Sequence, residues 1–118
     1  MIKGIGIDII EIDRIRKSIE KNSRLVNRVL TPEEQIVYQD LKSQSRQIEF
    51  LAGRFAAKEA FGKAAGTGIG KLSFQDIHVA ANENGAPSIV VEGYHTRHIF
   101  ISISHSKDYA VAQVIIEE

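Results

Sequence analysis

The sequence predicts one α+β domain in which helices pack on a largely antiparallel sheet. Two patterns lead to this fold class. Between residues 12 and 65, apolar residues recur at helical spacing behind helix start signals, whereas residues 76–116 form four short apolar runs separated by turn residues. The 118 residues contain no repeat, low-complexity tract or linker, so a single domain, 1–118, is expected.

An isoleucine-rich strand is expected over Ile2–Ile12, and its composition is typical of a buried strand. Alternate residues of a strand share a face, so Gly4, Gly6 and Asp8 point the same way. The carboxylate of Asp8 therefore projects beside two positions without side chains, where a bulky group can approach it.

Four helical segments are expected next. The first follows the strand directly and is broken at Asn22–Ser23, and the second covers 24–30. The T-P-E-E stretch at 31–34 starts the third, because it supplies a threonine N-cap, a proline at the first helical position and a glutamate that completes a capping box. The longest pattern runs roughly from Ser45 to Ala65.

The back half is predicted to form the remaining strands. Asn82–Gly85 is typical of a turn between the first two of them, and the S-H-S-K-D stretch at 104–108 links the last two. The four predicted runs are 76–81, 87–93, 98–104 and 109–116.

Composition narrows the function classes. The 15 basic and 15 acidic residues cancel, so bulk charge predicts no nucleic-acid partner. The absence of cysteine excludes disulfides, a thiol nucleophile and a thiolate metal site. No apolar stretch reaches the roughly 20 residues of a membrane span, and a signal-peptide pattern is missing. We expect a cytoplasmic protein without a membrane partner.

The long helix carries an unusual carboxylate. Glu59 lies among alanine, glycine and phenylalanine on one helix face, with Lys63 one turn later. Such a carboxylate fits a narrow, partly dry niche. On spacing alone, an ordinary surface Glu–Lys pair is the more usual explanation, and such a pair stabilises a helix by about 0.2–0.5 kcal/mol.

Asp8 and Glu59 are the candidate metal ligands. Two hard oxygen ligands suit Mg²⁺, whose coordination is completed by water and substrate phosphates. The alternative for Asp8 is a strand-end carboxylate hydrogen-bonded to nearby backbone. The glycine cluster 66–70 follows the helix instead of preceding one, so it indicates a helix C-cap, and its density indicates a close backbone approach.

His105 ends an apolar strand pattern and fits either a proton handler and anion donor or a capped strand-end histidine. The other three histidines show no metal-site spacing with it.

A basic stripe precedes residue 30. Its members step by three or four residues, with Glu20 as the only acidic residue between Arg14 and Arg28. A solvated helix face is the usual explanation, whereas a one-signed surface also favours an acidic protein partner. The stripe consists of Arg14, Lys17, Lys21, Arg24 and Arg28.

Three segments together resemble the holo-acyl-carrier-protein synthases, the small bacterial 4'-phosphopantetheinyl transferases. They are GIGIDIIEIDRI, FLAGRFAAKEAFGKAAGTGIG and ISISHSKDYAVAQVI, and the similarity extends over the whole chain. The resemblance implies the 4'-phosphopantetheinyl transferase fold. It also implies transfer of phosphopantetheine from coenzyme A to a serine of apo acyl carrier protein in fatty acid biosynthesis, with release of 3',5'-ADP. A homotrimer with active sites between subunits is implied as well.

The resemblance gives these residues roles. Asp8 and Glu59 are expected to hold Mg²⁺, and Lys63 to offset phosphate charge. Glu59 is the favoured general base, and His105 is the second candidate or a phosphate contact. The coenzyme A contacts would be Arg46, Arg54, Lys58, Lys63, Gly66, Thr67, Gly68, Asn84, Gly85 and His105. The acyl carrier protein would dock on Arg14, Lys21, Arg24 and Arg28.

Two other functions are compatible with parts of the sequence. A non-catalytic coenzyme A or nucleotide-binding regulatory module would keep the phosphate-holding cations but would not need Asp8 together with Glu59. A structural oligomer subunit would use the isoleucine-rich strands as its interface and leave Asp8, Glu59 and Lys63 unexplained.

Overall fold

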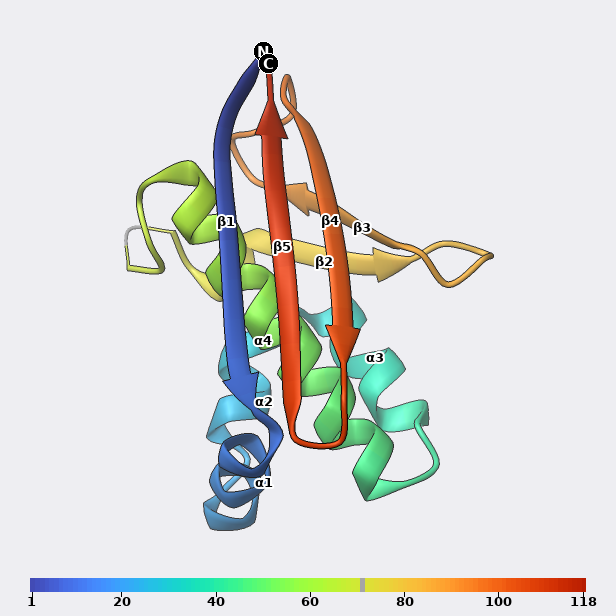
Figure 1. Ribbon diagram of the computed structural model, residues 1–118. Helices are drawn as coiled ribbons and strands as arrows, with labels where there is room; N and C mark the ends of the chain where they lie inside the picture. The colour runs from blue at the N-terminus through green and yellow to red at the C-terminus, as the bar shows by residue number, and fades with distance from the viewer. Residues whose placement is uncertain (71) are drawn as a thin grey trace.

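The computed structural model describes residues 1–70 and 72–118. Its elements confirm the α+β class and lie close to the predicted positions (Figure 1). In chain order they are β1 (Ile2–Glu11), α1 (Ile12–Lys21), α2 (Arg24–Val29), α3 (Pro32–Asp40), α4 (Gln44–Ala65), the 3₁₀ turn η1 (Phe74–Asp76), β2 (Ile77–Ala81), β3 (Pro87–Val91), β4 (His98–His105) and β5 (Tyr109–Glu117).

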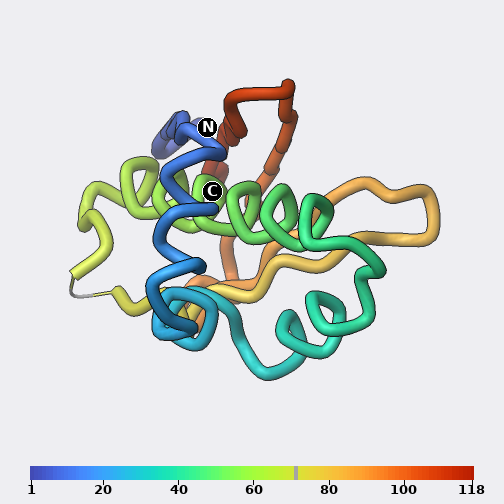
Figure 2. The backbone as a smooth tube through the Cα atoms, turned by 90° about the horizontal axis from the view of Figure 1, so that it is seen from below, coloured from blue at the N-terminus to red at the C-terminus, as the bar shows by residue number. Residues whose placement is uncertain are grey.

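The strands form two antiparallel sheets. The larger has the order β1-β5-β4, so the first strand of the chain pairs with the last, and β2 and β3 form a separate hairpin. Helix α4 packs across one face of the larger sheet (Figure 1). Seen from below, α4 lies between that sheet and a second layer that contains the β2–β3 hairpin (Figure 2). Helix α4 is therefore the central layer, with the larger sheet on one side and the layer that contains the hairpin on the other.

Two glycines of β1 let α4 approach the strand closely. A Cβ atom at Gly4 or Gly6 would overlap the backbone carbonyl of Ala64 or Ala60, respectively. The bulky group that approaches beside Asp8 is thus the backbone of α4. Because backbone packs on backbone here, the position of Asp8 relative to α4 is fixed by the main chain.

The opposite face of β1 is open to solvent in this chain. Ile5, Ile7 and Ile9 are 60%, 57% and 63% exposed, and Phe100 on β4 is 54% exposed. The expectation of a buried strand is therefore right for one face only. Exposed apolar patches of this kind are typical of interaction surfaces.

The helix boundaries follow local chemistry. Thr31 and Glu34 form the predicted capping box of α3, with Pro32 in its first turn. Helix α4 starts after Ser43, whose hydroxyl accepts from the amide of Arg46, and ends at Gly66 with φ 81°. Residues 22–23 separate α1 from α2, so the basic stripe does not lie on one continuous helix. Among the residues described, no helix is both long and apolar enough to cross a membrane.

Candidate active site

Asp8, Glu59 and Lys63 meet where β1 contacts the C-terminal half of α4. The ammonium of Lys63 donates to the Asp8 carboxylate at 3.1 Å and to the Ile7 carbonyl at 2.9 Å. The Asp8 side chain is 16% exposed and that of Lys63 is 54% exposed. Lys63 therefore pairs with the strand, and within residues 1–70 and 72–118 the one-turn Glu59–Lys63 ion pair is not formed.

The environment of Glu59 raises its pKa above the ordinary value. Partial burial is the main cause, the negative charge of Asp8 adds to it, and Lys63 and Arg28 act in the opposite direction. Two neighbouring carboxylates resist being ionised together unless a cation lies between them. A raised pKa also suits a carboxylate that accepts a proton during a reaction.

The residues present fit a Mg²⁺ ion bound mainly by substrate and water. Over the described part of the chain, no cluster of three or more His, Cys, Asp or Glu side chains could hold a metal. Asp8 and Glu59 supply two carboxylates within electrostatic reach of each other. Mg²⁺ commonly takes one or two carboxylates and completes its octahedron with waters and phosphate oxygens.

A second candidate region lies at the other end of α4. His105 and Arg54 contribute to a cavity of about 190 Å³ there. The imidazole Nδ1 of His105 lies 3.7 Å from the Glu49 carboxylate, and the Arg54 guanidinium stacks 4.1 Å from the centre of the Phe50 ring. The Nε of Arg54 is buried without a hydrogen-bond partner among the described atoms. The cavity is lined by Leu41, Arg46, Glu49, Phe50, Gly53, Arg54, Ile103 and His105.

The two regions occupy different sides of α4. Arg54 and Glu59 are five residues apart, which is about 140° around a helix axis, and Arg46 lies about 20 Å along the axis from Glu59. One copy of the chain therefore presents Asp8, Glu59 and Lys63 in one direction and the cavity residues in another.

Lys58 is not a ligand contact, which corrects the sequence-based expectation. Its side chain is completely buried, and its ammonium donates to Glu34 Oε1 at 2.6 Å, to the Val29 carbonyl at 2.6 Å and to the Phe74 carbonyl at 3.2 Å. Three acceptors saturate an ammonium group. The positive charge of Lys58 is thus bound inside the protein, although Lys58 is next to Glu59 in the sequence.

The glycine cluster folds back onto α4. The amide of Gly68 donates to the Gly62 carbonyl at 3.0 Å, and a Cβ atom at Gly62 would lie 2.9 Å from the backbone of Gly68. Gly66 and Gly68 have positive φ angles, as a chain reversal requires, and Thr67 is exposed. The sequence predicted that the backbone of the glycine cluster comes close to another group, and in the structure that group is α4 of the same chain.

Asn84 and Gly85 lie in the exposed turn of the β2–β3 hairpin, which projects from the body of the molecule (Figure 1). Within one chain, the structure does not bring them to Asp8.

The basic residues gather around a shallow hollow. Lys21, Arg24 and Arg28 line it together with Leu25, and Arg14 is exposed on α1 outside the lining. Arg28 also lies 5.7 Å from the centre of the Phe74 ring and affects the pKa of Glu59. The basic surface therefore borders the Asp8–Glu59–Lys63 region.

The sequence interpretation missed five residues of the cavity: Leu41, Glu49, Phe50, Gly53 and Ile103. Helical periodicity was the available signal, because Glu49 follows Arg46 by three residues and precedes Gly53 by four. Leu25, an apolar residue inside the basic hollow, was also missed because the charges dominate the pattern there.

Comparisons with known proteins converge on one family. A family model described as the 4'-phosphopantetheinyl transferase superfamily matches residues 4–114. The holo-[acyl-carrier-protein] synthase of Oceanobacillus iheyensis is 56% identical over 99% of this chain and 98% of the relative. That of Enterococcus faecalis is 52% identical over 99% of this chain and 98% of the relative.

Solved structures agree with this. A Bacillus anthracis holo-(acyl-carrier-protein) synthase in complex with CoA (3',5'-ADP) superposes with a TM-score of 0.90 at 50% identity, covering 100% of this chain and 98% of the other. The Helicobacter pylori enzyme in complex with coenzyme A gives a TM-score of 0.83 at 37% identity, covering 96% and 99% of the two chains.

Proposed function

The chain belongs to the 4'-phosphopantetheinyl transferase superfamily, and on this premise we propose that it acts as a holo-[acyl-carrier-protein] synthase. It transfers the 4'-phosphopantetheine group of coenzyme A to a serine of apo acyl carrier protein, in fatty acid biosynthesis, and releases 3',5'-ADP. The observation that carries this function is the meeting of Asp8, Glu59 and Lys63 at the β1–α4 contact. A module that only binds coenzyme A has no use for the two adjacent carboxylates.

The reaction is a phosphoryl-type transfer, which depends chiefly on positioning and charge stabilisation. The serine oxygen bonds to the β-phosphorus while the bond from that phosphorus to the bridging oxygen breaks, and 3',5'-ADP leaves with the electron pair. Glu59 accepts the serine proton, directly or through a water. Lys63 stabilises the added charge on the phosphate oxygens. Mg²⁺ held by Asp8 and Glu59 would neutralise charge on the pyrophosphate when bound.

The active site is proposed to form between subunits of a homotrimer. The positions of the Arg54–His105 cavity and of Glu59, about 140° apart around α4, support this, because two subunits could bring these two sides together at one coenzyme A. The exposed face of Ile5, Ile7 and Ile9 supplies apolar surface for assembly. Neighbouring subunits would then contribute Arg46, Arg54, Gly66, Thr67, Gly68, Asn84, Gly85 and His105 to the nucleotide and phosphates.

Mixed assemblies provide a test of the shared site. Glu59→Ala and Arg54→Ala variants are each expected to be nearly inactive alone. After co-unfolding and refolding together, about a quarter of the interfaces should combine two intact halves and recover transfer, if subunits mix at random. A mixture that stays inactive, although mass spectrometry shows mixed trimers, would place both halves in the same subunit.

The basic surface is proposed to dock the acidic carrier protein. Charge complementarity of this kind raises association rates and weakens as salt increases. The Arg14→Glu, Arg24→Glu double variant should raise KM for the carrier protein about tenfold or more at low salt, with little change at high salt. The KM for coenzyme A is the internal control, and an equal rise in both constants would contradict the assignment.

The function itself is tested by intact mass. Apo acyl carrier protein incubated with this protein, coenzyme A and Mg²⁺ should gain one phosphopantetheine group, and a chelator should prevent the gain. Binding of coenzyme A without any gain would instead support a regulatory module. Because both proposed substrates are intracellular, the proposed activity supports a cytoplasmic location.

A further inference from the structure

Helix α2 depends on contacts from elsewhere in the chain. It has six residues, and helices this short are not stable alone. At its C-terminal end, the Gln75 side-chain Nε2 lies within hydrogen-bond distance of the carbonyls of Asn27 at 3.1 Å, Arg28 at 3.2 Å and Leu30 at 2.8 Å, which share its two N–H groups. Lys58 donates to the remaining carbonyl, that of Val29. Gln75 and Lys58 thus reach all four carbonyls from 27 to 30, which a helix end leaves open, and the Gln35 side chain also donates to that of Leu30 at 3.0 Å.

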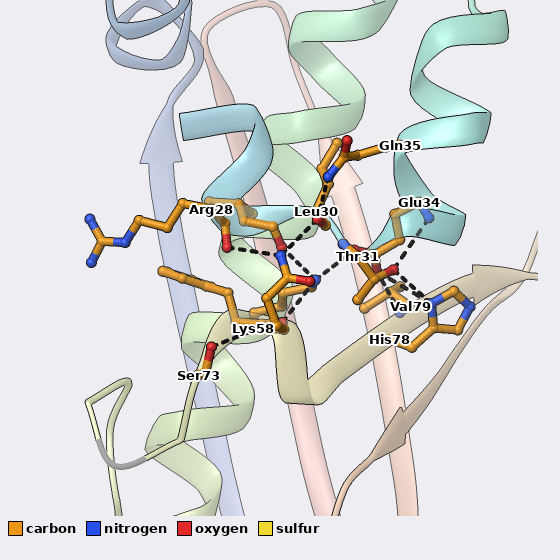
Figure 3. Close-up of polar contacts among 12 residues, drawn as sticks. Arg28, Leu30, Thr31, Glu34, Gln35, Lys58, Ser73, His78 and Val79 are labelled. Atoms are coloured by element: carbon orange, nitrogen blue, oxygen red, sulfur yellow. Dashed lines mark hydrogen bonds and ion pairs between the residues drawn. The ribbon is translucent and has the colours of Figure 1, made fainter. Parts of the chain in front are cut away.

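The Lys58 side of this arrangement is anchored in the protein interior (Figure 3). Its ammonium binds Glu34, whose carboxylate also accepts from the amides of Thr31 at 2.9 Å and Val79 at 2.7 Å. Helix α2 is therefore tied through Lys58 to α3, α4 and β2 at once.

The same contacts link the basic surface to Glu59. Lys58 immediately precedes Glu59 on α4, so the residue that holds the end of α2 is bonded through the main chain to the proposed base. Gln75 follows Phe74, whose ring lies under the Arg28 guanidinium. Helix α2, which carries Arg28, packs against α4, which carries Glu59. Movement of α2 would change the distance between the docking arginines and the reacting groups.

We propose that Gln75 and Lys58 are positioning residues that fix α2, and with it Arg24 and Arg28, relative to Glu59. The docked carrier protein then presents its serine at the site where Glu59 accepts the proton. This proposal rests on the proposed function. Neither residue needs to touch a substrate, because both act by holding the helix that does.

Gln75→Ala is the informative variant, since the residue is exposed and its loss leaves the core intact. The full-length assembled protein should show a kcat/KM for the carrier protein about 10- to 100-fold lower, because small misplacements of reacting groups have effects of this size. KM for coenzyme A should stay unchanged. Hydrogen exchange of the amides over residues 24–30 should increase. Gln39→Ala, an exposed glutamine on α3, is the matched control and should behave as wild type in all three measurements.

A double-mutant cycle separates positioning from general damage. In an Arg24→Ala, Arg28→Ala background, Gln75→Ala should cost less than about twofold more, because both guanidinium groups that the helix positions are gone. A full effect of Gln75→Ala in that background, an equal loss toward coenzyme A, or unchanged exchange of α2 would each overturn the proposal. Absence of transfer by the wild-type protein would instead overturn the proposed function.

Discussion

Replacing Glu59 with alanine is expected to lower kcat by about 10³-fold while the protein still folds and assembles. The substitution removes the proposed base, worth about 10² to 10⁴ in rate, and one of two carboxylates for Mg²⁺. Glu59 is partly exposed on α4, so alanine creates no cavity in the core. Transfer should be measured by intact mass of the carrier protein over a range of Mg²⁺ concentrations, alongside the molecular mass of the assembly.

Two further variants make this result specific. Glu59→Gln keeps the size and one acceptor oxygen but loses the charge and the ability to accept a proton, so it should lose a similar amount of activity. Glu92→Ala, at an exposed glutamate after β3, should transfer as wild type. Wild-type turnover by Glu59→Ala at saturating Mg²⁺ would remove Glu59 from the reaction.

Replacing Lys58 with methionine should lower the free energy of unfolding by about 3–5 kcal/mol. Methionine fills much of the same volume, but it leaves the Glu34 carboxylate as a buried charge without its cation, and removing one partner of a buried ion pair has costs of this size. Burial lowers the pKa of Lys58, and the Glu34 hydrogen bond and charge oppose that shift. Urea unfolding at one fixed protein concentration measures the change.

Two further variants test the role of the Lys58 charge, one as a control and one as a rescue. Lys42→Met, at an exposed lysine, should change stability by less than about 0.5 kcal/mol. The Lys58→Met, Glu34→Gln double variant should recover part of the loss, because neither charge remains to be buried. A Lys58→Met protein as stable as wild type would mean that the ammonium contributes nothing to the fold.

The predictable parts of this fold depend on local sequence. The capping box of Thr31 and Glu34, the turn at Asn82–Gly85 and the helix end at Gly66 each need only four or five residues to form. Sequence patterns describe these features because the determining contacts lie within one turn of chain.

The contacts that organise the site are long-range and were beyond such patterns. Lys63 meets Asp8 across 55 residues of sequence, and Lys58 meets Val29 across 29. Neighbouring residues on a helix point about 100° apart, so the proximity of Lys58 to Glu59 in sequence says nothing about a shared ligand. Residue patterns and the resemblance supplied the candidate residues, whereas only the structure showed which of them face inward.

The exposed isoleucines show a second limit of prediction from the sequence. An apolar run in sequence indicates burial, but it does not say whether the partner is the same chain or another copy. Ile5, Ile7 and Ile9 have the composition of core residues and lie on the solvent face of β1. Only a three-dimensional arrangement separates the folding core from an exposed apolar face.

The glycine-lined contact between β1 and α4 has a consequence for engineering. Because main chain meets main chain there, the spacing of Asp8 and Glu59 has no side-chain layer through which core redesign could adjust it. Variation aimed at new carrier proteins or new donors should therefore be directed at α1, α2 and the hairpin turn. Variant libraries that keep Gly4 and Gly6 should retain transfer activity while the carrier proteins or donors that are recognised change. The reaction centre of this small enzyme can then stay constant while the surrounding recognition surfaces vary.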